Sequence, residues 1–155
     1  MKIVLPIDIQ KKIIHALEKA GSRETGGILM GEHIESDVFR IVDLTIQKSY
    51  GNVFSFMRLI DNVSQALKTF FDKTNRQYTR YNYLGEWHSH PSFSTLPSSK
   101  DIESMSEIVN DKGVGANFVM LLIVRLNSAQ LIEGTATAFF PNSCPISCIL
   151  QMEDT

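Results

Sequence analysis

Two histidines and one aspartate form the most chemically suggestive pattern in this chain. His88 and His90 flank Ser89 and precede Pro91, and ten residues separate His90 from Asp101. On an extended segment, side chains at positions i and i+2 point to the same face, roughly 7 Å apart along the strand, so two imidazoles can converge on one ion. Two histidines and an aspartate around Zn²⁺ leave a fourth position for water, as in a catalytic site. The spacing predicts a zinc hydrolase.

The segment after the histidines also has the pattern of a helix start. Pro97 ends the preceding segment, Ser98 can cap the helix, and Asp101 three positions later approximates a capping box. This structural role does not compete with metal binding, because a helix beginning at Ser98 places Ser98 and Asp101 on one face. One piece of local structure would therefore aim both side chains at the metal.

These residues resemble the JAMM signature of the JAB1/MPN/Mov34 metallopeptidases, which is a distant Glu, then His-x-His-Pro and Ser-x-x-Asp. The resemblance lies in Glu24 of Glu-Thr-Gly-Gly, in Gly-Glu-Trp-His-Ser-His-Pro at 85–91, and in Pro97–Asp101. It covers nearly the whole chain, and no metal or catalytic position departs from it. The resemblance implies an active enzyme whose curved, mixed sheet is flanked by helices, with the metal at the edge of the sheet.

Each expected role has a physical reason. One Zn²⁺ per chain, held by His88, His90 and Asp101, keeps a net positive charge that polarises a carbonyl and acidifies a catalytic water. Amide hydrolysis also needs a base that takes the water proton and returns it to the leaving amine. The resemblance selects Glu24 for this base, which the sequence alone barely separates from Glu18, Glu32 and Glu35. Ser98 would donate a hydrogen bond to the oxyanion.

Composition limits the other classes of function. The chain has 155 residues, of which 43% are hydrophobic and 21% charged, which predicts one globular domain over residues 1–155. A net charge of −2 and a pI near 6.1 give no electrostatic reason to expect a nucleic acid partner. Pro6 and Asp8 interrupt the N-terminal apolar run, and the apolar run Phe118–Val124 is too short to span a bilayer. We expect a cytoplasmic protein that binds no membrane.

Specific residues exclude other classes of metallohydrolase. The chain has no His-Glu-x-x-His motif, which excludes thermolysin-like enzymes. Its two cysteines, Cys144 and Cys148, do not form the Pro-Cys-x-x-Cys of cytidine deaminases, and the chain is too short for a metallohydrolase barrel. We expect both cysteines to be reduced and unpaired.

Hydrophobic periodicity and turn residues predict helices alternating with strands in an α/β or α+β arrangement. The predicted helices run from Ile9 to Gly21, from residue 60 to 71, and from Ser98 to Asn110. The predicted strands are Gly26–Ile34, Val38–Gln47, Tyr81–His90, Phe118–Leu126 and Leu131–Phe139.

Four further side chains receive structural interpretations. Trp87 alternates with His88 along the strand and should face the core, while Glu86 is assigned no role. His15 and His33 lie in a helix and near a turn, where ordinary surface or packing roles are expected.

The substrate class follows from the resemblance alone. Active members typically cut the bond after the C-terminal tail of ubiquitin or a ubiquitin-like modifier, often an isopeptide bond to lysine. The short form and the residues at 85–91 are most similar to bacterial members, several of which accompany E1/E2-like enzymes in anti-phage (CBASS) operons. This implies deconjugation of a protein with an extended C-terminal tail, with E1/E2-like enzymes as partners. The alternatives are a peptidase that processes a sulfur-carrier or ubiquitin-like precursor, and a non-catalytic binding module.

Three aromatic residues allow two interpretations. Phe54 and Phe56, in the segment 49–56, and Phe93, in the loop after the histidines, either pack as core or form one wall of a substrate groove. In the second interpretation an extended tail pairs its backbone with a sheet edge and ends in glycines, which fit a narrow approach.

Overall fold

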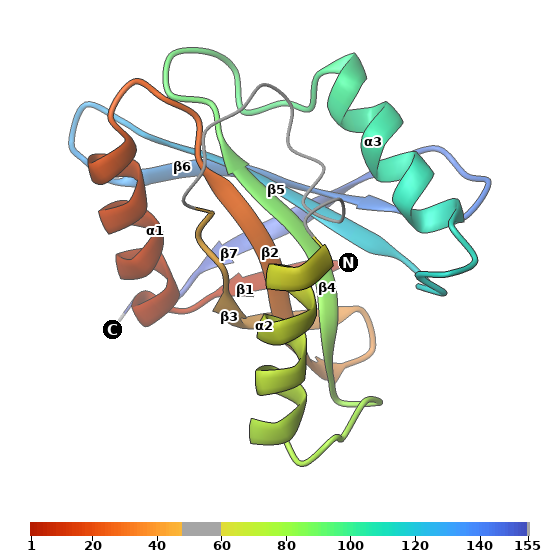
Figure 1. Ribbon diagram of the computed structural model, residues 1–155. Helices are drawn as coiled ribbons and strands as arrows, with labels where there is room; N and C mark the ends of the chain where they lie inside the picture. Colours follow the sequence, from red (N-terminus) through yellow and green to blue (C-terminus); the bar gives the residue numbers. More distant parts are fainter. Residues whose placement is uncertain (48–59, 155) are drawn as a thin grey trace.

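The computed structural model describes residues 1–47 and 60–154 and has the α+β architecture predicted from the sequence (Figure 1). Its strands are β1 (Lys2–Leu5), β2 (Gly26–Glu35), β3 (Val38–Leu44), β4 (Tyr81–Ser89), β5 (Val119–Leu126), β6 (Ile132–Phe139) and β7 (Ile146–Met152). Its helices are α1 (Ile7–Ala20), α2 (Ile60–Lys73) and α3 (Ser99–Asn110). Within these described ranges, no helix has the length and apolar character needed to cross a membrane.

The strands form one mixed sheet that closes on itself. Their order is β1-β3-β2-β4-β5-β6-β7, and β1 pairs again with β7. β4 pairs antiparallel with β2 on one side and parallel with β5 on the other. The two histidines lie at the carboxyl end of this interior strand, and closure gives every described strand a partner on each side. The position of the metal at the edge of the sheet stays a prediction.

A β-bulge in β4 depends on one glycine. The pairing of β4 with β2 shifts register between Leu29, which pairs with Gly85, and Met30, which pairs with Tyr83. Gly85 has a φ of +146°, and a Cβ at this position would lie 1.9 Å from the carbonyl oxygen of Met120. Only glycine fits this conformation and this close approach. Beyond the bulge, β4 runs in regular register to its carboxyl end.

Different helices cover the two faces of the sheet (Figure 1). The apolar side of α1 joins a large buried cluster on one face. On the other face, Phe70 of α2 clusters with Ile28 of β2, and Met105 of α3 clusters with Leu121 of β5. Because Glu86 of β4 pairs with both Ile28 and Leu121, the end of β4 runs between the parts of this face that α2 and α3 cover.

The elements agree with the sequence prediction except at the two ends of the chain. α1 ends where Gly21 takes a φ of +61° and donates its N–H to the carbonyl of Leu17, as expected for a glycine C-cap. β1 and β7 are absent from the prediction. These two strands pair with each other and close the sheet.

Candidate metal centre

The two histidines lie at the carboxyl end of β4 and are buried. His88 pairs with Gly26 of β2 and with Ile123 of β5. His90 follows directly after the strand, where its N–H donates to the carbonyl of Val124 at 2.9 Å. His88 is 7% exposed and His90 is 4% exposed.

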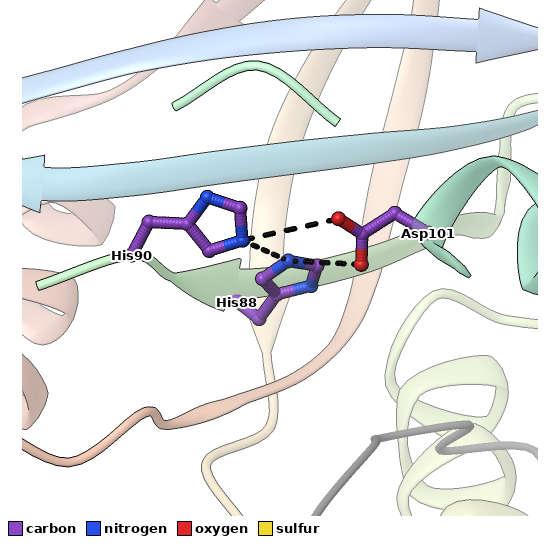
Figure 2. Close-up of side chains that lie close together, drawn as sticks. All are labelled: His88, His90 and Asp101. Carbon is purple, nitrogen blue, oxygen red and sulfur yellow. Dashed lines mark hydrogen bonds and ion pairs between the residues drawn. The ribbon is translucent and has the colours of Figure 1, made fainter. Parts of the chain in front are cut away.

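Both imidazoles and the carboxylate of Asp101 converge on one point (Figure 2). The Nε2 atoms of His88 and His90 are 3.0 Å apart. Asp101 Oδ1 is 3.4 Å from Nε2 of His88, and Asp101 Oδ2 is 3.9 Å from Nε2 of His90. One ligand atom from each residue lies within 4.8 Å of the others, and residues 1–47 and 60–154 contain no second trio of His, Cys, Asp or Glu side chains this close. The fold brings the predicted ligands together.

The start of α3 aims Asp101 at the histidines. Ser98 is the N-cap, and its Oγ accepts the N–H of Asp101 at 3.2 Å. In return, Asp101 Oδ2 accepts both the backbone N–H and the hydroxyl of Ser98, each at 2.7 Å. This reciprocal capping box is the one predicted from the sequence. It holds Oδ2 against the helix start and leaves Oδ1 directed at His88.

A backbone carbonyl fixes the tautomer of His90. Nδ1 of His90 lies 2.5 Å from the carbonyl oxygen of Ser94. Since a carbonyl can only accept, Nδ1 carries the proton and donates, and Nε2 of the neutral ring presents its lone pair to the trio. The ring of His90 also stacks on Phe93, with centroids 4.1 Å apart and an interplanar angle of 29°. Phe93 is 48% exposed, so one ring face of this residue remains open to solvent or a partner.

Burial keeps His88 neutral. Desolvation lowers the pKa of His88 to about 4, and the neighbouring His90 adds to this effect, while the negative charge of Asp101 opposes it. A neutral imidazole is the form that binds a metal ion. At neutral pH, His88 therefore needs no deprotonation before it can act as a ligand.

Glu24 lies next to the histidine segment along the backbone. The N–H of Thr25 donates to Ser89 Oγ at 3.0 Å, and the N–H of Ser89 donates to the carbonyl of Thr25 at 2.8 Å. Gly26 pairs with His88, so the chain that leaves β2 at Glu24 runs alongside His90. Neither Thr25 nor Ser89 belongs to the predicted site, although Ser89 stands between the two ligands and is fully buried.

Two neighbours of His88 on β4 are buried for different reasons. Trp87 faces the core as predicted and donates its indole N–H to the carbonyl of Thr45 at 2.9 Å. Glu86, which received no role from the sequence, is only 2% exposed and shares the face of His88. Burial raises the pKa of the nearby Tyr83 hydroxyl, and the negative charge of Glu86 adds to this. A buried carboxyl therefore lies on the same face of β4 as His88 and near the Tyr83 hydroxyl.

The remaining candidates lie apart from the trio or outside the described residues. His15 and His33 are exposed, as expected of surface histidines. Cys144 and Cys148 are free, which confirms the prediction of unpaired thiols. Phe54 and Phe56 fall outside the residues that the structure describes.

The geometry of the trio suits a tetrahedral metal ion. Bonds of about 2.0–2.2 Å to nitrogen and oxygen ligands place the ligand atoms of a tetrahedral site roughly 3.3–3.6 Å apart. The two Nε2 atoms are 3.0 Å apart and Asp101 Oδ1 is 3.4 Å from Nε2 of His88, and both distances are close to this range. Two neutral nitrogen ligands and one carboxylate match a borderline divalent ion and leave one coordination position open.

A family model matches most of the chain. Residues 6–137, which include the whole candidate centre, match the model described as prokaryotic homologs of the JAB domain. A protein of Enterobacter hormaechei subsp. hoffmannii named CD-NTase/cGAS isopeptidase is 34% identical to this chain over 109 residues. The match covers 68% of this chain and 57% of that protein, so the chain spans little more than half the length of this relative.

Two solved structures share the fold. A solution structure of a protein from Desulfitobacterium hafniense has a TM-score of 0.67 at 15% identity, covering 99% of this chain and 94% of that one. A solution structure of a protein from Salinibacter ruber has a TM-score of 0.54 at 19% identity, with 99% and 92% covered. At these identities the likeness concerns the fold alone.

Proposed function

The chain belongs to the prokaryotic JAB domain family, and from that premise we propose that it is a zinc-dependent isopeptidase. It would hydrolyse the amide bond that joins the C-terminal tail of a ubiquitin-like modifier, or of a conjugated protein, to its target. The observation that carries this proposal is the convergence of His88, His90 and Asp101 within 4.8 Å. Three protein ligands would leave the fourth position of a tetrahedral ion for water.

In this proposal, His88 and His90 bind the zinc through Nε2, and Asp101 binds it through its carboxylate. The carbonyl of Ser94 and the capping box at Ser98 keep these ligands in place. When bound, zinc polarises the scissile carbonyl and acidifies the attacking water. The aligned ligand atoms require little rearrangement before the ion binds, because two of the three ligands are buried and hydrogen-bonded.

Glu24 is the proposed general base. It would take a proton from the attacking water and deliver it to the departing amine, because an amine leaves poorly without protonation. The support is its place in the chain. Glu24 precedes the Thr25–Ser89 pair of hydrogen bonds and is partly buried, and continued alternation from Gly26 would direct it to the face of His88.

Ser98 is the proposed donor to the oxyanion. Its hydroxyl donates to Asp101 Oδ2 at 2.7 Å, so it must rotate toward the substrate during the reaction. The backbone N–H of Ser98 also donates to Oδ2 at 2.7 Å, which keeps the carboxylate in place while the hydroxyl moves. Two donors on one carboxylate oxygen therefore allow Ser98 to serve both the ligand and the intermediate.

The conjugated protein is proposed from the relative in Enterobacter. Its name specifies a CD-NTase/cGAS isopeptidase, so we infer a lysine-linked conjugate of a CD-NTase-type enzyme as the substrate class. E1/E2-like enzymes of the same anti-phage system would form the bond that this chain removes. The exposed ring of Phe93 beside His90 is the proposed contact for the extended tail.

Cleavage assays with two matched substrates test the proposal. One substrate joins a CD-NTase by its C-terminal carboxyl to the lysine side chain of a fluorescent peptide, and the other joins the same two parts by a linear peptide bond. We expect zinc-loaded wild type to cleave the first substrate and to prefer it over the second. Glu24→Gln should keep its zinc and lose about 10²–10⁴-fold of the rate. Cleavage of neither substrate, or wild-type turnover by Glu24→Gln, would contradict the proposal.

A further inference from the structure

The loop between β4 and α3 is held by three consecutive backbone carbonyls. Each accepts a hydrogen bond from a different side chain: Arg125 Nη1 donates to Phe93 O at 3.1 Å, His90 Nδ1 to Ser94 O at 2.5 Å, and Thr135 Oγ1 to Thr95 O at 2.5 Å. The middle carbonyl belongs to the candidate centre, and the outer two do not. We call the outer two contacts, made by Arg125 and Thr135, the carbonyl clamp.

We propose that Arg125 and Thr135 are positioning residues that fix His90 through this loop. The inference rests on the proposed function, since it concerns the same centre, and it adds the β5–β6 hairpin as the support of a metal ligand. Neither residue belongs to the JAMM-like pattern in the sequence, and neither lies among the three converging ligands.

The middle carbonyl cannot hold its position alone. Residues 91–97 form turns and bends and take part in no strand ladder. Ser94 is exposed, and its Oγ accepts the N–H of Leu96 at 3.2 Å within the loop. With Phe93 O and Thr95 O both held, the plane of each flanking peptide is restricted, and Ser94 O stays within reach of His90 Nδ1. This contact in turn fixes which nitrogen of His90 carries the proton.

The two clamp side chains stand on a rigid frame. Arg125 of β5 pairs directly with Glu133 of β6, and its Nε donates to Glu133 Oε2 at 2.9 Å. This ion pair turns the guanidinium so that Nη1 remains available for Phe93 O. Thr135 of β6 pairs with Ile123 of β5, which itself pairs with His88. The clamp and the other imidazole ligand are therefore supported by the same strands.

Substitutions of the two clamp residues test this inference, each with its own control. Thr135→Val removes the hydroxyl and keeps the shape, whereas Thr135→Ser keeps the hydroxyl. Arg125→Met removes the donor, and Arg76→Met removes an arginine from an exposed ion pair with Asp72, away from the centre. The measurements are zinc affinity by chelator competition, the visible spectrum of the Co²⁺-substituted protein, and kcat and KM on the isopeptide substrate.

We expect Thr135→Val and Arg125→Met each to weaken zinc binding about 10-fold, at the lower end of the range for groups that orient a ligand. The Co²⁺ spectrum should change, because the ring of His90 is less firmly oriented, and kcat should fall more than KM rises. Thr135→Ser and Arg76→Met should match wild type. Arg125 is partly exposed, so Arg125→Met should fold. If Thr135→Val does not fold, Arg125→Met alone tests the inference.

Two outcomes separate this inference from the proposed function. If wild type binds zinc and cleaves, yet Thr135→Val and Arg125→Met keep wild-type zinc affinity and an unchanged Co²⁺ spectrum, the clamp has no positioning role. If wild type binds zinc without cleaving the substrate, the zinc affinity and the Co²⁺ spectrum of the variants still test the clamp, and only the enzymatic proposal is contradicted. A wild type that binds no zinc contradicts both.

Discussion

The two ends of the β2–β4 strand pair contain the same kinds of side chain and differ in what they can bind. At the carboxyl end of β4, His90 stacks on Phe93 with ring centroids 4.1 Å apart. At the other end, His33 stacks on Phe39 with centroids 4.8 Å apart. The rings of His90 and Phe93 meet at 29°, and those of His33 and Phe39 meet at 16°. A stacked histidine is therefore common to both ends.

An arginine–glutamate pair is also present at each end, and its use is what differs. Arg80 donates to Glu32 Oε1 at 2.6 Å, so the carboxylate next to the exposed His33 already has a cationic partner. At the β4 end, Arg125 is directed to Glu133 and the loop, and Asp101 is left to face the histidines. Residue type alone therefore does not make a metal site. Such a site also needs buried imidazoles and a carboxylate that has no cationic partner.

The largest expected effect is on zinc affinity, when the histidine at one end or the other is removed. His88→Ala should weaken zinc binding by more than about 100-fold, since loss of a direct ligand exceeds the 10–100-fold cost of changing the groups behind it. His33→Ala should leave zinc affinity unchanged. Chelator competition on both purified variants measures the difference. Equal zinc affinity in the two variants would show that the two ends do not differ in metal binding.

A second effect is the pH dependence of the metal-free protein. Its folded state holds the pKa of His88 at about 4, whereas the unfolded chain has the ordinary value of 6.5, so the unfolded state takes up the proton first as the pH falls. The stability that depends on neutral His88 is complete above pH 6.5 and is lost between pH 6.5 and 4. This amounts to about 3 kcal/mol.

The measurement for this effect is a difference between two melting curves. From pH 7 to pH 4, the melting temperature of the metal-free wild type should fall by about 6–12 °C more than that of metal-free His88→Ala. Using the difference removes the contribution of the carboxylates that titrate in both proteins. Parallel curves would show that His88 is not the source of the pH dependence.

The smallest expected effect concerns the cap that keeps Asp101 in place. Ser98→Ala removes a helix N-cap and one hydrogen bond to Asp101 Oδ2, which should cost about 1 kcal/mol of stability. Zinc affinity should fall by about 10-fold, because the carboxylate is then held by one donor instead of two. Ser98→Thr, which keeps a hydroxyl, serves as the control. Wild-type melting and zinc binding in Ser98→Ala would mean that the cap does not support the ligand.

Most of the elements that position the site could be predicted from the sequence. The strand at 81–90, Pro97 before the helix and the Ser98–Asp101 spacing are local signals, and the structure contains each of them as expected. β1 could not be predicted because it is only four residues long and directly precedes Pro6. The inward residues of β7 do alternate, but Ile149 on the outer face is 69% exposed and obscures the pattern.

The contacts that hold the metal ligands in place could not be predicted from the sequence, for a different reason. Ser94 acts through its backbone carbonyl, which leaves no trace in residue type. Arg125 and Thr135 reach the loop only because β5 and β6 pair beside it, and this pairing is long-range. Short-range patterns carry none of this information. Glu86 differs, because it lies two residues before His88 on β4 and shares its face by simple alternation, which is a signal that the sequence does contain.

Anomalous scattering at the zinc absorption edge, from crystals of the zinc-loaded wild type, tests the central claim most directly. We predict one zinc peak per chain, bonded to Nε2 of His88, Nε2 of His90 and a carboxylate oxygen of Asp101, with none beside His33. A zinc ion bound by other residues, or no peak between these three side chains, would contradict the assignment of the centre.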